Sequence, residues 1–379
     1  MSASTSFTSR LLGSLVLWQK LVLPLVALAA PAAVFAVLYL DGVAGRADAA
    51  RVALDVGRFA DALDPMLIYV SDHRGQMGSH FRGETDAKAQ ALESESRIDA
   101  QIAAIDAIDE AVGQRVGLRE PWGEIRNDWS ALKSRVFSLD ETESRNQHVA
   151  LIGKLTHAFH LLFRRGSVEA SDSNQLVLME LVLDRLPLAL AATADLRGRT
   201  ASAVKAGQIP DKQKGQLLAL LADVKERTAD LEHFIPSSES SDDAETRELQ
   251  SALAAVTSAD GAFVSMLDEK VFAPDKPGVA FNEVFSQGTQ ALQALQSFAS
   301  AGSKVLSRQL ESDLEHARRA HLIAAVVATT LLLLAAVIAW LITRMVTGNV
   351  RETAIDGASG PAAAASERSH AAIDAATDP

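Results

Sequence analysis

Two apolar segments constrain the fold of this chain more than any other feature of its sequence. Residues 21–40 and 322–343 contain no Asp, Glu, Lys or Arg. Each is close to the roughly 20 residues that a helix needs to cross about 30 Å of hydrocarbon. We therefore expect two membrane-spanning helices, at residues 21–40 and 321–343. A cleaved signal peptide is the alternative for the first segment, but its apolar region is longer than such peptides usually have.

The charges that flank these segments say little about orientation, because Arg and Lys lie on both sides of each one. Long domains cross a membrane largely regardless of their charge. We therefore place residues 41–320 outside the cytoplasm, in the periplasm of a Gram-negative cell. Residues 1–20 and 344–379 are then the cytoplasmic ends of a protein in the bacterial inner membrane.

Composition excludes several classes of protein and site. The net charge of -12 argues against nucleic acid as a partner, since phosphate binding needs a clustered basic face. The chain has no cysteine, so disulfides, Cys-ligated metals and a thiol nucleophile are absent. Only 5% of the residues are aromatic, and Ala and Leu dominate, which favours helix over sheet.

Apolar residues between the two segments recur at intervals of three and four, the spacing of a helix that buries one face. Ile98, Ile102 and Ile105 show this pattern, and Gly and Pro fall between the periodic runs. We expect an all-α protein, with a polar loop at 236–243 and helices over 44–81, 85–112, 122–137, 140–166, 175–205 and 211–235, and from about 282 into the second apolar segment.

A short motif occurs twice in the chain. Asp, Arg, Gly, Ser and a cation stand at the same relative positions in residues 72–82 and 195–205, which are 123 residues apart. This repeat predicts two related halves, residues 41–170 and 171–320, with a turn and a helix N-cap at 171–174 between them. We expect two stacked four-helix bundles, and a single elongated bundle is the alternative.

The motif also supplies the candidate binding residues. On a helix, its Gly, Ser and cation fall at i, i+4 and i+7, and therefore on one face. Small residues beside a cation form a groove suited to carboxylate, nitrate or phosphate-like oxygens. The candidate ligand-binding residues are Arg74, Ser79, Arg82, Arg197, Ser202 and Lys205. The alternative is structural, with the cations paired to acids such as Asp72 or Glu84.

Catalytic signatures are absent from the sequence. We find no Gly-rich phosphate loop, no His-Glu-x-x-His helix and no Gly-x-Ser-x-Gly elbow. His157 and His160 are three residues apart, but no acid nearby in the sequence completes a metal site, so we interpret them as polar-face histidines. We expect a protein that is not an enzyme and that has no cofactor and no metal.

The arrangement resembles the sensor half of bacterial transmembrane receptors, mainly methyl-accepting chemotaxis proteins and related histidine kinases. His73-Arg74-Gly75 is similar to the Glu-Arg-Gly signature of nitrate- and nitrite-sensing domains, with His73 in place of Glu. The resemblance covers residues 21–351. It implies a fold of two helical bundles, arginines at the ligand site and signalling through small displacements of the last helix.

The segment after the second apolar run departs from these receptors. Residues 342–352 are similar to the opening of a HAMP linker, with Asn349 where Pro is expected, and an Ala-rich tail follows. That tail is too short for a HAMP bundle, a methylated signalling hairpin or a kinase. We expect a small-anion sensor that acts as a homodimer or as a mixed dimer with a full-length receptor. The alternative is a non-sensing membrane scaffold or a truncated receptor without output.

Overall fold

The computed structural model describes residues 17–235 and 244–374, and every secondary-structure element in that part of the chain is helical. The all-α fold class is therefore confirmed. The polar loop predicted at 236–243 lies outside the described residues. Side chains are described for residues 33–235 and 244–341, and for only a few positions outside those two ranges.

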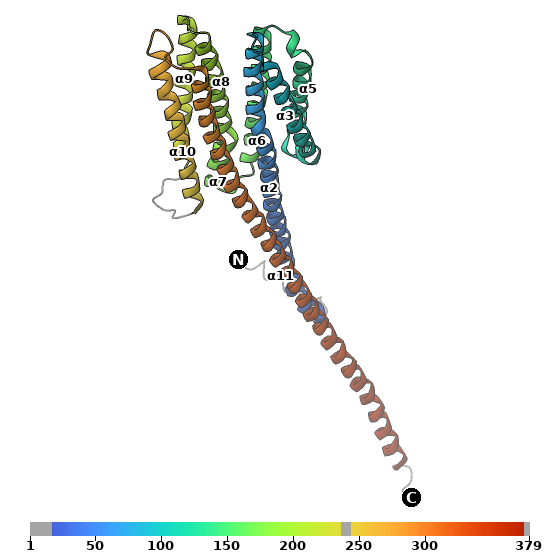
Figure 1. Cartoon of the computed structure of the whole chain (residues 1–379). Helices are drawn as coiled ribbons and strands as arrows, with labels where there is room; N and C mark the ends of the chain where they lie inside the picture. Colours follow the sequence, from blue (N-terminus) through green and yellow to red (C-terminus); the bar gives the residue numbers. More distant parts are fainter. Residues whose placement is uncertain (1–16, 236–243, 375–379) are drawn as a thin grey trace, which may run out of the picture. The chain divides into compact units, whose positions relative to one another are not determined.

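The first half of the chain contains long helices separated by short turns (Figure 1). Its α-helices are α2 (Leu17–Phe81), α3 (Ala87–Ile108), α4 (Gln114–Val116), α5 (Arg119–Arg135) and α6 (Glu141–Ser167). Pro65 does not end α2. Asp140 begins α6 as its N-cap, where its carboxylate accepts a hydrogen bond of 2.8 Å from the Glu143 backbone N–H.

The second half has α7 (Ser173–Glu180), α8 (Leu186–Lys205), α9 (Asp211–Leu231), α10 (Ala244–Leu267) and α11 (Phe281–Asp374). Within the turn predicted at 171–174, Asp172 is the N-cap of α7 and accepts a hydrogen bond of 2.9 Å from the Gln175 N–H. The single helix predicted over 175–205 is divided by a π-helical turn, Leu181–Arg185. Pro187 follows this turn, and because proline has no N–H to continue the α-helical ladder, wider local hydrogen bonding is accommodated there.

The chain divides into two compact units. The larger one consists of residues 47–315, and the smaller one holds the described residues up to Arg46 and from His316 onward. In the larger unit, α2, α3, α5 and α6 form one group of helices and α8, α9, α10 and the start of α11 form another (Figure 1). Both predicted halves therefore belong to one compact unit.

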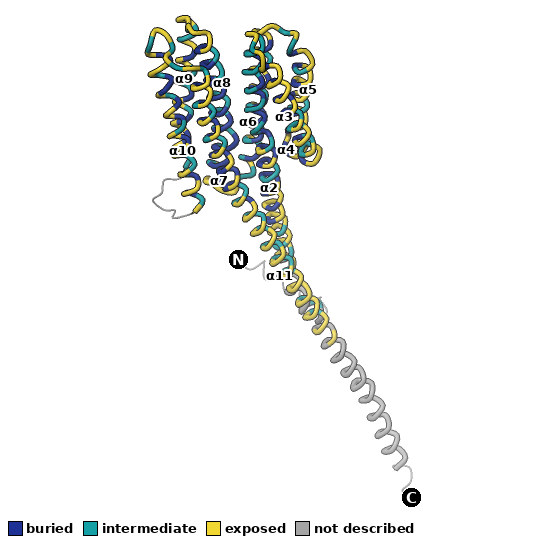
Figure 2. Tube along the Cα trace, in the orientation of Figure 1, coloured by how far each residue is buried: buried dark blue, intermediate teal, exposed yellow. Residues whose placement is uncertain are grey.

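The larger unit buries two hydrophobic cores, seen as the inward-facing dark segments of Figure 2. The first core contains Trp122 and Trp129, the two core anchors expected from the sequence, and it continues through Leu190 into Leu295 and Phe298 of the second group. The second core centres on Phe263. The first core therefore contains residues of both groups of helices. At the predicted boundary, residue 171, the chain makes a turn, but the core does not end there.

Helices α2 and α8, which carry the repeated motif, run in the same direction. Residue 72 contacts 197, residue 74 contacts 195, and residue 84 contacts 205, so the offset between partners is nearly constant along both helices. The two groups of helices thus lie side by side along α2 and α8.

In the smaller unit, α11 contains a stretch long and apolar enough to cross a membrane. Its mean hydropathy is 2.8 and none of that stretch is buried; Leu322, Leu333 and Leu341 are among its exposed side chains. No other helix among the described residues meets this criterion. Side chains are described for only half of the first predicted span, residues 21–40, and that half exposes Phe35 and Leu38.

Candidate functional site

The two copies of the motif form reciprocal ion pairs between α2 and α8. Arg74 Nη1 lies 2.9 Å from Asp195 Oδ1, and Arg197 Nη2 lies 2.5 Å from Asp72 Oδ1. The Arg of each copy therefore binds the Asp of the other copy. The sequence predicts a separate groove at each copy of the motif. In the structure the two copies contact each other and form one interface between α2 and α8.

A cavity of about 570 Å³ lies elsewhere between α2 and α11, whereas the motif interface opens into a cavity of about 480 Å³. The cavity at the motif is lined by α2, α6, α8 and the start of α9. Its lining residues include Arg74, Gly75, Gly78, Arg82, Glu141, Ser144, Arg145, Asp195, Gly198, Arg199, Ser202 and Lys212. The small residues of the motif are part of this lining, as expected for a groove beside cations.

Positive charge predominates in this motif cavity. Five cationic side chains and two carboxylates line it. Arg145 and Lys212 are exposed there and have no carboxylate partner within the described part of the chain. The Arg74 side chain is largely buried but still lines the cavity, and burial lowers the pKa of its guanidinium, while Asp195 acts in the opposite direction. Unpaired cations such as Arg145 and Lys212, together with the desolvated Arg74, attract an anion to the cavity.

The structure separates the predicted site residues into two sets. Arg74, Arg82 and Ser202 line the motif cavity. Ser79 does not line it, and its hydroxyl accepts a hydrogen bond of 3.2 Å from Arg82. Lys205 also lies outside the lining, where its Nζ is 2.6 Å from Glu84 Oε1.

Arg197 is the sixth predicted residue, and it is buried rather than open to a ligand. Besides Asp72, its guanidinium donates to the Thr289 hydroxyl at 3.0 Å and lies 4.5 Å from the centre of the Phe285 ring. Gly288 makes room for it, since a Cβ there would approach the Arg197 side chain to 2.6 Å. Arg197 therefore connects α8 with α2 and α11.

Three cavity cations were missed by the sequence prediction: Arg145, Arg199 and Lys212. Arg199 stands four residues after Asp195 and lies 3.6 Å from it, so its helical spacing was a usable signal. Arg145 and Lys212 come from α6 and α9, outside the repeat. No pattern in the sequence connects them with the motif; tertiary packing alone brings them together.

A buried chain of polar groups begins at the cavity wall and continues into the first core. His148 Nδ1 lies 2.7 Å from the Ser144 carbonyl oxygen, and His148 Nε2 lies 2.8 Å from His73 Nδ1. The carbonyl can only accept, so His148 Nδ1 donates to it. His148 Nε2 then accepts from His73 Nδ1, which leaves His73 Nε2 without a proton.

Glu95 Oε1 lies 3.6 Å from this His73 Nε2, and both atoms are buried without a hydrogen-bond partner. Burial lowers the pKa of His73 to about 3, with His148 adding to the effect, and lowers the pKa of His148 to about 4, with Arg74 contributing. Burial also raises the pKa of Glu95. The raised pKa of Glu95 favours its protonated form, which can donate a hydrogen bond to an unprotonated His73 Nε2.

His157 and His160 do not complete a metal site. Their rings lie 6.4 Å apart, and an acid does approach one of them, because Asp184 Oδ1 is 3.0 Å from His160 Nδ1. This acid was missed in the sequence since it belongs to a different helix. Among the described residues, no group of three or more His, Asp or Glu side chains is placed to hold a metal ion.

Comparison with known proteins gives little further guidance. No protein-family model matches the chain, and no curated protein matches it. A solved structure titled "Structure of the NasR transcription antiterminator" is similar over 75% of this chain and 81% of that chain, with a TM-score of 0.47 and 13% identity. A likeness of that size shows neither the fold nor the function of this chain.

Proposed function

We propose that this protein is a membrane-anchored, sensor-like receptor chain that binds a small anion in the motif cavity. The observation that carries the proposal is the excess of cations there, two of which, Arg145 and Lys212, have no carboxylate partner in the described part of the chain. In the proposal the chain is a binding protein and not an enzyme.

In this proposal the bound anion competes with the carboxylate of Asp195 for the arginine side chains of the cavity. Asp195 holds Arg74 of α2 at 2.9 Å and Arg199 of its own helix at 3.6 Å, so both guanidinium groups already share one carboxylate at the cavity. A ligand carboxylate or nitrate accepts from the same donors and also reaches Arg145 and Lys212 from the opposite wall. Such a ligand draws α6 and α9 toward α8.

The proposed signal passes from α8 to α11. Arg197 on α8 contacts Thr289 and Phe285 on α11, and Lys205 lies over the Phe281 ring at 5.0 Å. α11 is also the helix whose later residues form the apolar stretch. We propose that residues 21–40 are a second span, that residues 41–320 are periplasmic, and that the receiver is a second copy of this chain or a full-length receptor in a mixed dimer.

The test uses the full chain in detergent micelles and measures its melting temperature against nitrate, acetate, succinate and malate. Ligand at about 100 times its Kd adds roughly 2.7 kcal/mol of stability. We expect at least one anion to raise the melting temperature. Arg145→Gln and Lys212→Gln should each diminish that shift, because neither residue has an internal ion pair to lose. Arg58→Gln, an exposed Arg of α2 outside the cavity, is the matched control.

A second candidate function is a membrane scaffold that does not sense. It is favoured by the internal pairing of the motif cations: Arg74 with Asp195, Arg197 with Asp72, and Lys205 with Glu84. In that case the motif only fastens the two groups of helices together. No response to any anion, with unchanged melting in Arg145→Gln, would support this candidate against the sensor.

A further inference from the structure

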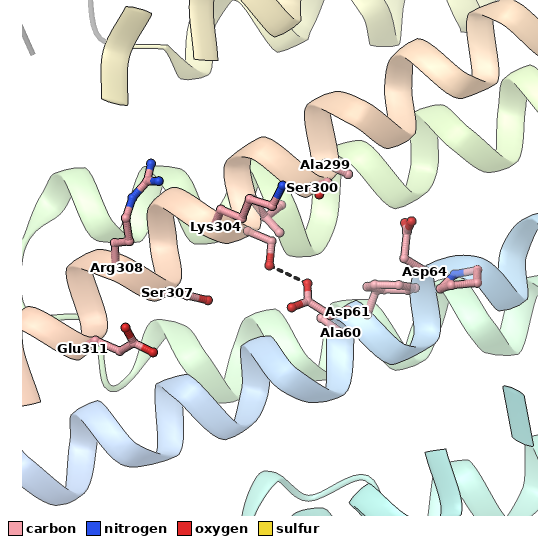
Figure 3. Close-up of a pocket in the computed structure, with 13 residues that line it drawn as sticks. Ala60, Asp61, Asp64, Ala299, Ser300, Lys304, Ser307, Arg308 and Glu311 are labelled. Carbon is pink, nitrogen blue, oxygen red and sulfur yellow. Dashed lines mark hydrogen bonds between the residues drawn. The ribbon is translucent and has the colours of Figure 1, made fainter. Parts of the chain in front are cut away.

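A second cavity of the 47–315 unit lies between α2 and α11, away from the motif. It has a volume of about 570 Å³ and combines an acidic wall on α2 with a wall on α11 that carries hydroxyl groups, Lys304 and Arg308, and also Glu311. Figure 3 shows Asp61 and Asp64 on α2 facing α11, which carries Ser300, Lys304 and Arg308. Phe159 of α6 and the adjoining Val182 add an apolar side.

Opposite charges in this cavity are left without partners. Asp64 and Lys304 make no hydrogen bond or ion pair with any described residue. Their neighbours are satisfied: Asp61 accepts from the Ser303 hydroxyl, and Arg308 donates to Glu245 and Glu248 at 3.0 and 2.9 Å. Asp64 is half-buried and Lys304 is exposed at the cavity. Two opposite charges that line one cavity without pairing leave room for a ligand that carries both an ammonium group and a carboxylate.

We propose that the cavity between α2 and α11 is a second binding site, separate from the motif cavity, for a zwitterionic amino acid. The ligand ammonium group is bound by Asp64 with Asp61 beside it. Its carboxylate is bound by Lys304 and the Ser300 hydroxyl. Its side chain lies against Phe159 and Val182.

Charge and size favour an amino acid over other ligands. A simple anion would be repelled by the two carboxylates on α2, and a metal ion would be repelled by the Lys304 ammonium group on α11. Neither ligand therefore matches the charges of both α2 and α11. Ligand pockets of about 300 to 1,000 Å³ hold small molecules, and a mixture of apolar and few convergent polar groups is typical of them. An α-amino acid carries both charges on adjacent carbon atoms.

The protonation state of Asp64 agrees with this assignment. Burial, with the nearby Asp61 charge, raises the pKa of Asp64 to about 6. A carboxyl group in that position is costly to ionise without a counter-charge, and a ligand ammonium group supplies one. The other charged groups facing the cavity are Asp61 on α2, and Lys304, Arg308 and Glu311 on α11.

The experiment screens the standard L-amino acids against the full chain in detergent by melting temperature, and then measures the best one by calorimetry. The matched probes are its decarboxylated amine and its deaminated acid. We expect the amino acid to bind, and each probe to bind roughly tenfold more weakly or worse, because each lacks one charged hydrogen-bonding group.

Variants decide whether binding occurs at this cavity. Asp64→Asn and Lys304→Gln should each weaken binding roughly tenfold to hundredfold. Asp275→Asn and Lys276→Gln, exposed residues outside the cavity, are the matched controls. Arg74→Gln should leave amino-acid binding unchanged, so this result is independent of the anion proposal. Asp64→Asn should fold at least as stably as the wild type. If no amino acid binds, or if binding persists in both cavity variants, the proposal is overturned.

Discussion

Arg74 and Arg197 occupy the same position of the repeated motif, and each pairs with the Asp of the other copy, yet their surroundings differ. Arg74 lines an open cavity together with other cations. Arg197 is enclosed by Asp72, Thr289 and the Phe285 ring. The difference arises from α11, which covers the second copy of the motif and not the first.

The two copies of the motif can therefore have different roles, one in stability and the other in binding. Asp195, the partner of Arg74, has a second cation 3.6 Å away in Arg199, so its charge does not depend on Arg74 alone. Asp72 has no other cationic partner among the described residues. We infer that the Arg197 pair holds the helices together, and that the Arg74 pair can exchange its carboxylate for a ligand.

The largest expected effect is the loss of stability on removing Arg197. Arg197→Ala leaves Asp72 without its partner in a partly buried position and should cost about 3–5 kcal/mol of unfolding free energy. Arg74→Ala should cost only about 1–2 kcal/mol, because Asp195 retains Arg199. Chemical denaturation of both full-length variants, followed by circular dichroism, measures the difference. Equal losses would mean that the two copies of the motif play the same role.

Acid should weaken the fold through the buried histidines beside Arg74. The pKa values of His73 and His148 are about 3 and 4 in the folded protein. Below about pH 6.5 the unfolded chain therefore binds more protons than the folded one, and unfolding becomes easier. The raised pKa of Glu95 acts in the opposite direction, because the folded protein then keeps a proton that the unfolded chain releases.

A variant isolates the contribution of one histidine. Between about pH 6.5 and about pH 5, the wild type should lose about 2 kcal/mol relative to His148→Asn, which has no ring to protonate. Denaturation of both proteins across this range gives the difference directly. Parallel pH profiles would show that His148 is not held neutral by burial.

The space that Gly288 leaves for Arg197 gives a smaller effect. Gly288→Ala places a Cβ within 2.6 Å of the Arg197 side chain and should cost about 1–3 kcal/mol as the arginine is displaced. Gly261→Ala on α10 is the control, because nothing lies within 4 Å of its new Cβ. There alanine should add about 0.5–1 kcal/mol through its better helix propensity. A melting temperature for Gly288→Ala as high as for Gly261→Ala would contradict the close contact.

Local signals in the sequence were sufficient for much of the fold. The three-and-four spacing predicted the helices, and Asp172 was correctly identified within the N-cap turn. The side-by-side packing was not predictable, because residues such as Asp72 and Arg197 give no sign of which distant helix they meet. The same holds for the π-helical turn before Pro187, which depends on hydrogen bonding rather than on apolar periodicity.

The candidate site was predicted only where the repeat marked it. Arg74, Arg82 and Ser202 line the motif cavity, whereas Arg197 and Lys205 are used in internal pairs. Helical spacing places a side chain on a face, but a neighbouring helix such as α11 decides whether that face is open. Arg145 comes from a helix outside the repeat, so only the packed structure reveals it as a cavity residue.

The most direct test of the motif cavity as the anion site is calorimetric titration of the full chain with the anion that stabilises it most. Arg74→Gln should weaken binding at least about tenfold, through loss of a charge-assisted hydrogen bond, while it loses no more than about 1–2 kcal/mol of unfolding free energy. Arg58→Gln should bind as the wild type does. Equal affinity in Arg74→Gln and the wild type would contradict the assignment of the motif cavity as the anion site.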